Sequence, residues 1–346
     1  MNIDLASLPP RRTGPTTWSG PDMAARRQEW IWRLSPAEIG ELEAAAEAVL
    51  DSGADLTSIR AADFVLPELA PRLLELRLEL INGRGFALLR GLPVADYSYE
   101  KTAAIFYGLG THLGNTRAQN AQGDILGHVR NLGMDSRDPN VRIYQTKERQ
   151  TFHTDSCDVV GLLCLQPALS GGRSLLVSAD TVFNEIRDRR PDLLKLLLEP
   201  IATDRRGEVP AGMLPYLLIP VFSYYEGRIT PFYQRQYIDS AQRFPDAPRL
   251  TDRHVEALDL FDAYCNDPAL HFSMMLEKGD MQFVYNHAML HDRTGFEDAA
   301  EPEKRRHLLR LWLSTPGDRP LPPEFATRYG SVEIGNRGGV GPVVAR

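Results

Sequence analysis

The chain has 346 residues, of which 43% are hydrophobic and 25% are charged, a composition typical of a globular enzyme. A chain of this length can bury a large core without disulfides or structural metals. Its net charge of −7 offers no basic field that would attract nucleic acid or an anionic membrane. We therefore expect neither nucleic acid nor a membrane as a partner.

The three cysteines are Cys157, Cys164 and Cys265. They form no CxxC pair and require no disulfide, which predicts a reducing, cytoplasmic location. The first residues carry prolines and arginines in place of an apolar signal core. The longest apolar run, 159–165, is too short to span a membrane. The composition does not determine the oligomeric state, and a homo-oligomer remains possible.

The N-terminal part predicts an irregular segment followed by helices. Residues 1–30 are rich in Pro, Arg and Gly and indicate an irregular strap or a partly disordered arm. Ser35 and Glu38 flank Pro36 in the pattern of a capping box, which predicts the start of a helix. Apolar residues then repeat at helical spacing as far as Leu50. Further along, the same criteria predict helix 68–81, strand 86–89 and helix 99–109.

From about residue 114 the pattern changes to short strands broken by turn residues, as in a double-layered β fold. Asp180 is expected to cap a helix, and another helix should follow Pro191. The remaining expected elements are strands 159–165, 174–177, 281–285 and 307–313 and helix 251–265. No repeat or linker is evident, so we expect a single domain over 1–346. It would comprise an N-terminal strap and helices (1–82), a core (83–315) with an insertion (about 183–270), and an irregular, loose surface tail (316–346).

The segment 151–155 (Thr-Phe-His-Thr-Asp) is the first candidate for chemistry. On a strand, residues i and i+2 point to the same face, so His153 and Asp155 could reach one metal ion. A second histidine would complete the two-His, one-carboxylate set of non-haem iron oxygenases. Two histidines further along the chain, His287 and His291, could supply it. A His-x-Asp pair alone is common by chance.

Arg306 and Arg310 lie in a predicted apolar strand and would share one face of it. Arginines turned toward a protein interior are costly unless anions meet them. A dicarboxylate cosubstrate or an acidic substrate would supply such anions, because arginine binds carboxylates in a bidentate manner. An internal ion pair with an acidic residue would also satisfy Arg310.

Four motifs occur in order: His-x-Asp, Pro-x-x-x-Gly-Gly-x-Ser, Asn-x-x-x-x-His-x-Arg and Arg-x-x-x-Arg. This order resembles the taurine dioxygenase and clavaminate synthase superfamily of iron(II)/2-oxoglutarate oxygenases, over residues 83–313. The resemblance implies a mainly β fold with flanking α-helices. Its core would be a double-stranded β-helix (jelly roll), with N-terminal helices outside and the inserted segment 183–270 as a lid over the mouth of the barrel.

The resemblance also implies site residues, of which the iron ligands would be His153, Asp155 and His291. Ser174 and Arg306 fall where the family binds the distal carboxylate of 2-oxoglutarate. Arg310 matches a second arginine that in some members binds the anionic group of the substrate. One departure is His287, which stands where several relatives have an arginine, and no role of that arginine is carried over. The resemblance favours His291 over His287 as the iron ligand.

The implied activity is a dioxygenase that uses Fe²⁺, 2-oxoglutarate and O₂ and releases succinate and CO₂. The default outcome is hydroxylation of a C–H bond in a small organic substrate. Two other functions remain open: a metal-binding sensor and a zinc hydrolase. The pair of arginines with Ser174 argues against the sensor, and no general base for the hydrolase can be nominated by spacing. Among the other histidines, His128 could line the cavity, whereas His307 should face away from Arg306.

Overall fold

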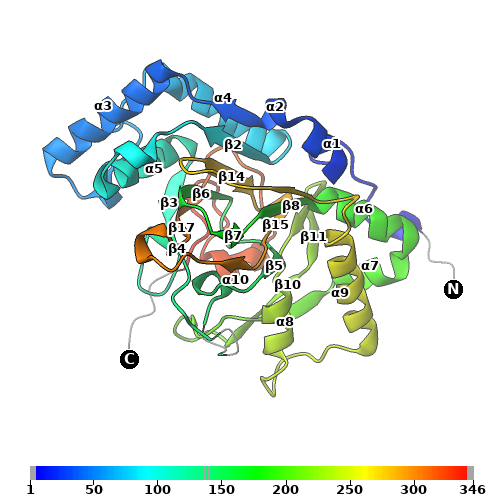
Figure 1. Cartoon of the computed structure of the whole chain (residues 1–346). Coiled ribbons are helices and arrows are strands. Elements are labelled where there is room, and N and C mark those ends of the chain that lie inside the picture. The colour runs from blue at the N-terminus through cyan, green and yellow to red at the C-terminus, as the bar shows by residue number, and fades with distance from the viewer. Residues whose placement is uncertain (1–4, 136–137, 139–140, 341–346) are drawn as a thin grey trace.

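Two β-sheets face each other in the computed structural model, which describes residues 5–135, 138 and 141–340 (Figure 1). The ends of the predicted strap and tail, residues 1–4 and 341–346, lie outside the described residues. The major sheet has the order β1 (Ile31–Arg33), β2 (Phe86–Arg90), β14 (Met281–Tyr285), β6 (Val159–Gln166), β17 (His307–Ser314) and β3 (Asn115–Arg117), with β4 (Leu126–Val129) also paired to β17. The minor sheet has the order β13 (Phe272–Met274), β8 (Ser174–Ser178), β15 (Met289–Arg293) and β5 (Gln150–His153). This arrangement confirms the predicted jelly-roll core with flanking helices.

The N-terminal helices cover the outer face of the major sheet. They are α3 (Pro36–Ser52), α4 (Leu69–Asn82) and α5 (Tyr99–Leu113). The capping box of Ser35 and Glu38 is confirmed at the start of α3. Helix α4 packs on β2 and β14, and α5 packs on β17 (Figure 1). The central strands β6 and β17 are therefore buried on both faces, which explains their continuous apolar sequences.

A second group of helices covers the minor sheet: α6 (Ala179–Arg189), α7 (Pro191–Leu197) and α9 (Asp252–Cys265). Phe152 of β5 and Leu290 of β15 are buried in one cluster with these helices. Because strand residues alternate between faces, their neighbours His153 and His291 turn toward the interior between the sheets. The predicted cap at Asp180 is wrong, since the side chain of Ser178 accepts the capping hydrogen bond from Thr181.

The rest of the expected insertion consists of β9 (Pro200–Asp204), β10 (Tyr216–Pro220), β11 (Phe222–Tyr225), β12 (Arg228–Pro231) and α8 (Arg235–Ala241). These strands form two separate two-stranded sheets, β10-β9 and β11-β12. The shorter elements are η1 (Leu5–Ser7), α1 (Gly20–Ala25), α2 (Arg27–Trp30), η2 (Leu56–Ser58), η3 (Val94–Asp96), η4 (Ile143–Gln145), β7 (Ser170–Gly171), β16 (Phe296–Glu297), η5 (Pro302–Lys304), η6 (Pro323–Phe325) and α10 (Ala326–Tyr329). None of the helices in the described ranges is long and apolar enough to cross a membrane.

The described part of the N-terminal strap packs on the core. Residues 8–19 form no helix or strand, as expected of an irregular strap, and α1 and α2 follow them. Trp18 and Trp30 are buried against Phe86, each with ring centroids 5.6 Å away. Thr16 donates a hydrogen bond of 2.5 Å to Asp180, the residue expected to be a helix cap. Tertiary burial of two tryptophans therefore outweighs the proline- and glycine-rich composition of this segment.

The described part of the C-terminal tail is also fixed, and the expected loose surface segment is wrong as far as residue 340. The side chain of Arg337 is fully buried. Its Nε donates to Asp158 at 2.8 Å, and its Nη2 donates to Asp318 at 2.6 Å. A glycine-rich sequence gives no periodic signal. These long-range ion pairs, together with backbone hydrogen bonds such as that from Val340 N–H to the carbonyl of Ala118, hold the tail on the core.

Candidate metal centre

Two histidines face each other across the minor sheet. His291 of β15 and His153 of β5 are direct partners in the antiparallel register, and their ring centroids are 4.1 Å apart. Asp155 lies beyond the end of β5, so strand alternation does not place it. Instead, Thr154 N–H donates to the carbonyl of Tyr233 at 3.0 Å, and Asp155 N–H donates to Asn286 Oδ1 at 2.9 Å. These bonds hold the loop so that the carboxylate meets the histidines.

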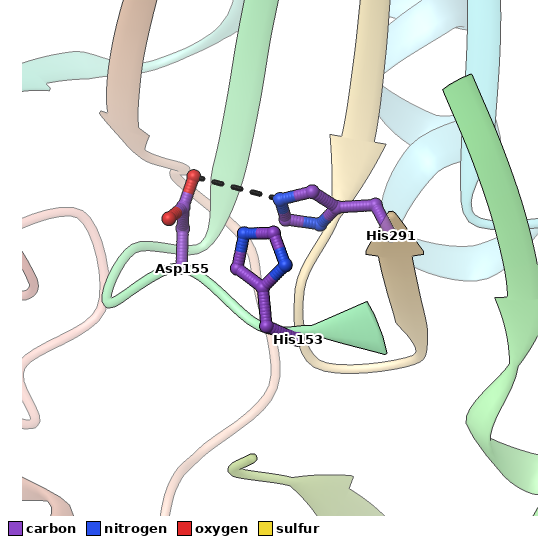
Figure 2. Close-up of side chains that lie close together, drawn as sticks. All are labelled: His153, Asp155 and His291. Carbon is purple, nitrogen blue, oxygen red and sulfur yellow. Dashed lines mark ion pairs between the residues drawn. The ribbon is translucent and has the colours of Figure 1, made fainter. Parts of the chain in front are cut away.

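The three side chains converge on one point between the sheets (Figure 2). Asp155 Oδ2 is 3.7 Å from His291 Nε2, and one potential ligand atom from each of the three residues lies within 4.8 Å of the others. Two imidazole nitrogens and one carboxylate oxygen form the donor set that leaves open positions on non-haem iron(II). The structure thus brings together His153, Asp155 and His291, as the sequence predicts.

The electrostatics of this cluster suit a bound cation. Burial, reinforced by the neighbouring His153, lowers the pKa of His291 to about 3. Burial likewise lowers the pKa of His153. Burial opposes ionisation of Asp155, but Arg310 and the two histidines outweigh it, so the pKa of this carboxyl lies below its ordinary value. Neutral imidazoles and an ionised carboxylate are the protonation states that metal binding requires.

His287 belongs to a different buried group. Its Nε2 lies 2.8 Å from Asp158, and Asp318 completes a second set of close ligand atoms. The guanidinium of Arg337 already binds both carboxylates of this set. The second group is therefore an ion network that ties the tail to the core, and His287 does not reach the first cluster.

Arg306 is a buried cation that forms no ion pair with any carboxylate in the part of the chain that the structure describes. Its Nη1 is buried and has no hydrogen-bond partner among the described residues. Burial lowers the pKa of Arg306 to about 10. Because an unpaired buried charge is costly, this guanidinium calls for an anion.

A cavity joins Arg306 to the metal-ligand cluster. The space between its walls, counted together with the open solvent at its mouth, is about 510 Å³. Arg306, Ser174 and all three residues of the cluster line it. The Ser174 hydroxyl donates to Gln282 at 2.9 Å and lies in the first position of β8. The cavity thus has metal-ligating side chains in one part of its wall and a cation that could bind a carboxylate in another. This arrangement fits an iron(II) ion together with a dicarboxylate.

Arg310 is partly satisfied within the protein. Its Nε donates to Gln119 at 2.6 Å, and its Nη1 is 4.0 Å from Asp155 Oδ2. Its guanidinium also stacks over the ring of Tyr144, 4.5 Å from the centroid. The internal ion pair that the sequence left open is present, although Arg310 still lines the cavity.

The sequence assigned no role to two residues beside the cluster, Trp312 and Asn286. Trp312 donates its indole N–H to Asp155 Oδ2 at 3.0 Å. Strand alternation from Arg310 could have indicated it. Asn286, quoted only as part of a motif, supports the backbone of Asp155. Gln119, which binds Arg310, lies in an irregular polar segment, where the sequence favours a pocket residue and a solvated loop equally.

His128 is a hydrogen-bonded histidine and does not line either cavity beside the cluster, so the alternative of a cavity-lining role is excluded. It is exposed beside His307, with its Nδ1 2.8 Å from His307 Nε2. Burial, followed by His128 and Arg130, lowers the pKa of His307 to about 4. Between about pH 6.5, where free histidine titrates, and pH 4, the unfolded chain therefore binds more protons at this site than the folded protein. The free energy of unfolding is therefore not reduced by His307 above pH 6.5, and it falls as the pH drops from 6.5 toward 4.

We expect His307→Gln to weaken the decline in unfolding free energy between about pH 6.5 and pH 4. Urea unfolding at a series of pH values measures this decline. The control is His254→Gln, a change at a half-buried histidine in the capping box of α9. The same pH dependence in wild type and His307→Gln would contradict this assignment.

Comparison with known proteins adds three findings. The model of the family "Taurine catabolism dioxygenase TauD, TfdA family" matches residues 52–312. FR-33289 synthase from Streptomyces rubellomurinus is 30% identical over 328 residues, which cover 92% of this chain and 95% of the relative. A uridine-5'-phosphate dioxygenase from a Streptomyces species is 29% identical over 257 residues, or 67% of this chain and 86% of the relative.

The fold is also similar to that of solved structures. The structure of an asparagine oxygenase in complex with Fe(II), 2S,3S-3-hydroxyasparagine and succinate aligns with a TM-score of 0.63 at 18% identity. The alignment covers 82% of this chain and 93% of the other.

Proposed function

Since the chain belongs to the taurine catabolism dioxygenase TauD, TfdA family, we propose that it is an iron(II)- and 2-oxoglutarate-dependent dioxygenase acting through the cluster described above. His153, Asp155 and His291 hold the iron. Ser174 and Arg306 bind the distal carboxylate of 2-oxoglutarate. The substrate is a small organic molecule that is hydroxylated. We further propose that the chain works as one domain, with the segment 183–270 covering the site, in the cytoplasm.

The observation that carries this proposal is the unpaired guanidinium of Arg306 in a cavity shared with the His-Asp-His cluster. A metal-binding sensor or a zinc hydrolase has no need of a buried arginine at that position. A dicarboxylate bound to the metal at one end would bring its other carboxylate to Arg306 and Ser174. Arginine is suited to such a bidentate contact.

When bound, iron(II) and 2-oxoglutarate supply the O₂-dependent oxidation of a C–H bond, with release of succinate and CO₂. The chain supplies orientation. Burial keeps both histidines neutral and free to donate lone pairs. The indole N–H of Trp312 fixes one oxygen of Asp155, as outer partners of metal ligands commonly do. The buried walls of the cavity limit the access of water to the reacting groups.

The named relatives point to small polar substrates of different kinds. One acts on uridine 5'-phosphate, and the asparagine oxygenase structure holds a hydroxylated amino acid. We therefore propose a small polar substrate for this chain as well. The three free, buried cysteines support a cytoplasmic location.

The test is an anaerobic titration of the metal-free protein with iron(II) and then 2-oxoglutarate. We expect a weak visible charge-transfer band that needs both additions. In Arg306→Ala the 2-oxoglutarate concentration for half-maximal absorbance should rise by roughly 30-fold or more, because a buried charged contact is lost. The neighbouring Arg305→Ala serves as the control, since Arg305 donates only to surface carbonyls. Equal 2-oxoglutarate dependence in wild type and Arg306→Ala would refute the cosubstrate assignment.

A further inference from the structure

A second cavity opens from the same cluster. The space between its walls, counted together with the open solvent at its mouth, is about 590 Å³. It shares His153, Asp155 and Arg310 with the cosubstrate cavity. Much of its wall comes from the inserted segment, including Phe232 and Tyr237. A small molecule in this second cavity would therefore place one end beside the proposed iron site.

Two arginines away from the proposed iron ligands line this second cavity, Arg142 and Arg328. Arg142 precedes β5, whereas Arg328 comes from α10, beyond the residues that the family model matches. Both guanidiniums approach a single carboxylate, Glu208: Arg142 donates a hydrogen bond to it, and Arg328 Nη1 lies 3.7 Å from it. These three side chains are only 10–13% exposed. One carboxylate therefore serves two buried guanidiniums.

The local charge is consequently positive. Burial, together with Arg142, outweighs Glu208 and lowers the pKa of Arg328. At Arg142 burial is outweighed by Glu208, which raises the pKa, so Glu208 pairs mainly with Arg142 and leaves Arg328 the less satisfied of the two. The other carboxylate in this part of the wall, Asp204, is already bound by Ser240 at 2.6 Å and by Arg243 at 3.2 Å. An anion bound in the second cavity would neutralise this excess positive charge.

Neutral donors stand beside the two arginines. Burial raises the pKa of Tyr237, whose ring lines the cavity, so its hydroxyl keeps its proton and can donate it to a hydrogen bond. Ser156 also lines the cavity and accepts a 2.7 Å hydrogen bond from Arg328 Nε, which fixes the direction of that guanidinium. The arrangement offers donors from the loop before β5, from α8 and from the tail.

We propose that Arg142, Arg328 and Tyr237 bind a phosphate or phosphonate group of the substrate, with the carbon to be oxidised lying beside the metal-ligand cluster. This inference rests on the proposed function and adds its substrate class. A tetrahedral dianion has three terminal oxygens that can accept from donors on three elements at once, whereas a carboxylate has two in one plane. Arginine is the side chain best suited to bind such groups. A cationic end group would be repelled.

The test uses the holoenzyme with iron(II) and 2-oxoglutarate under anaerobic conditions, titrated calorimetrically with three probes of similar length: butylphosphonate, butyl phosphate and pentanoate. The charge-transfer band is recorded first, because its absence would refute the proposed function and not this inference. With the band present, we expect the phosphonate, the phosphate or both to bind at least about 10-fold more tightly than pentanoate. Comparing these two probes tells a phosphonate substrate from a phosphate ester.

Substitutions of Arg328 and Glu208 then test whether these residues line the anion-binding site. Arg328→Gln should weaken binding of the preferred probe by about 10- to 100-fold, the effect of losing a hydrogen bond to a charged group, and leave the band unchanged. Glu208→Gln should leave binding equal or tighter, because it removes the competing negative charge. Arg253→Gln, a surface change on α9, is the matched control. Equal binding of pentanoate and the dianions, weaker binding in Glu208→Gln, or unchanged binding in Arg328→Gln with the band intact would overturn the proposal.

Discussion

Replacing Asp155 with alanine is expected to abolish turnover and to weaken iron(II) binding by at least about 100-fold. Changing the outer partners of a metal ligand typically costs 10- to 100-fold in affinity, so removal of a ligand should cost at least as much. Asp155 also supplies the only carboxylate among the described residues of the His153–Asp155–His291 cluster. Without it, iron would face two neutral imidazoles and the positive charge of Arg310.

The measurement is equilibrium binding of iron(II) under anaerobic conditions, together with succinate formation once a substrate is known. Asp51→Ala, a change at an exposed helical position, is the matched control. We expect the variant to fold, because the loop that carries Asp155 is held by backbone N–H groups that donate to Asn286 and Tyr233. Near-ultraviolet circular dichroism verifies that it does. A folded Asp155→Ala protein that binds iron as the wild type does would exclude this residue as a ligand.

Replacing Arg337 with alanine is expected to lower the free energy of unfolding by about 3–5 kcal/mol. The change leaves Asp158 and Asp318 as buried charges without their guanidinium partner, and breaking a buried ion pair from one side has a cost of this size. His287 remains 2.8 Å from Asp158 and offsets part of the loss. Urea unfolding measures the effect.

The control for Arg337→Ala is Arg253→Ala, whose salt bridges lie at the surface, where solvent screens them, and should contribute little to stability. Iron affinity should fall as well in Arg337→Ala. The tail that Arg337 anchors also donates from Gly339 N–H to the carbonyl of Ser156 at 2.7 Å, next to Asp155. A loss of stability no larger than that of the control would mean that the buried network contributes little to holding the tail.

The sequence by itself determined the elements whose pattern is local and the residues whose motif is contiguous. The capping box at Ser35 and the continuous apolar strands β6 and β17 follow from short-range periodicity and sterics. The two histidines were identified because ordered motifs indicated their family. Strand alternation predicted that Arg306 and Arg310 share one face, but Arg306 precedes β17 and a register shift lies between His307 and Leu308, so alternation does not place Arg306.

Only the tertiary structure determined which distant residues contact the site residues and which segments pack on the core. Asp155 reaches the cluster through a loop held by Asn286, 131 positions away, and not through strand alternation. The order of the N-terminal strap and the C-terminal tail depends on buried tryptophans and on the ion pairs of Arg337. Arg142 and Arg328 meet at Glu208 from segments far apart in the chain. Such contacts leave no periodic trace, because their free energy comes from long-range burial and charge pairing that no local window of sequence contains.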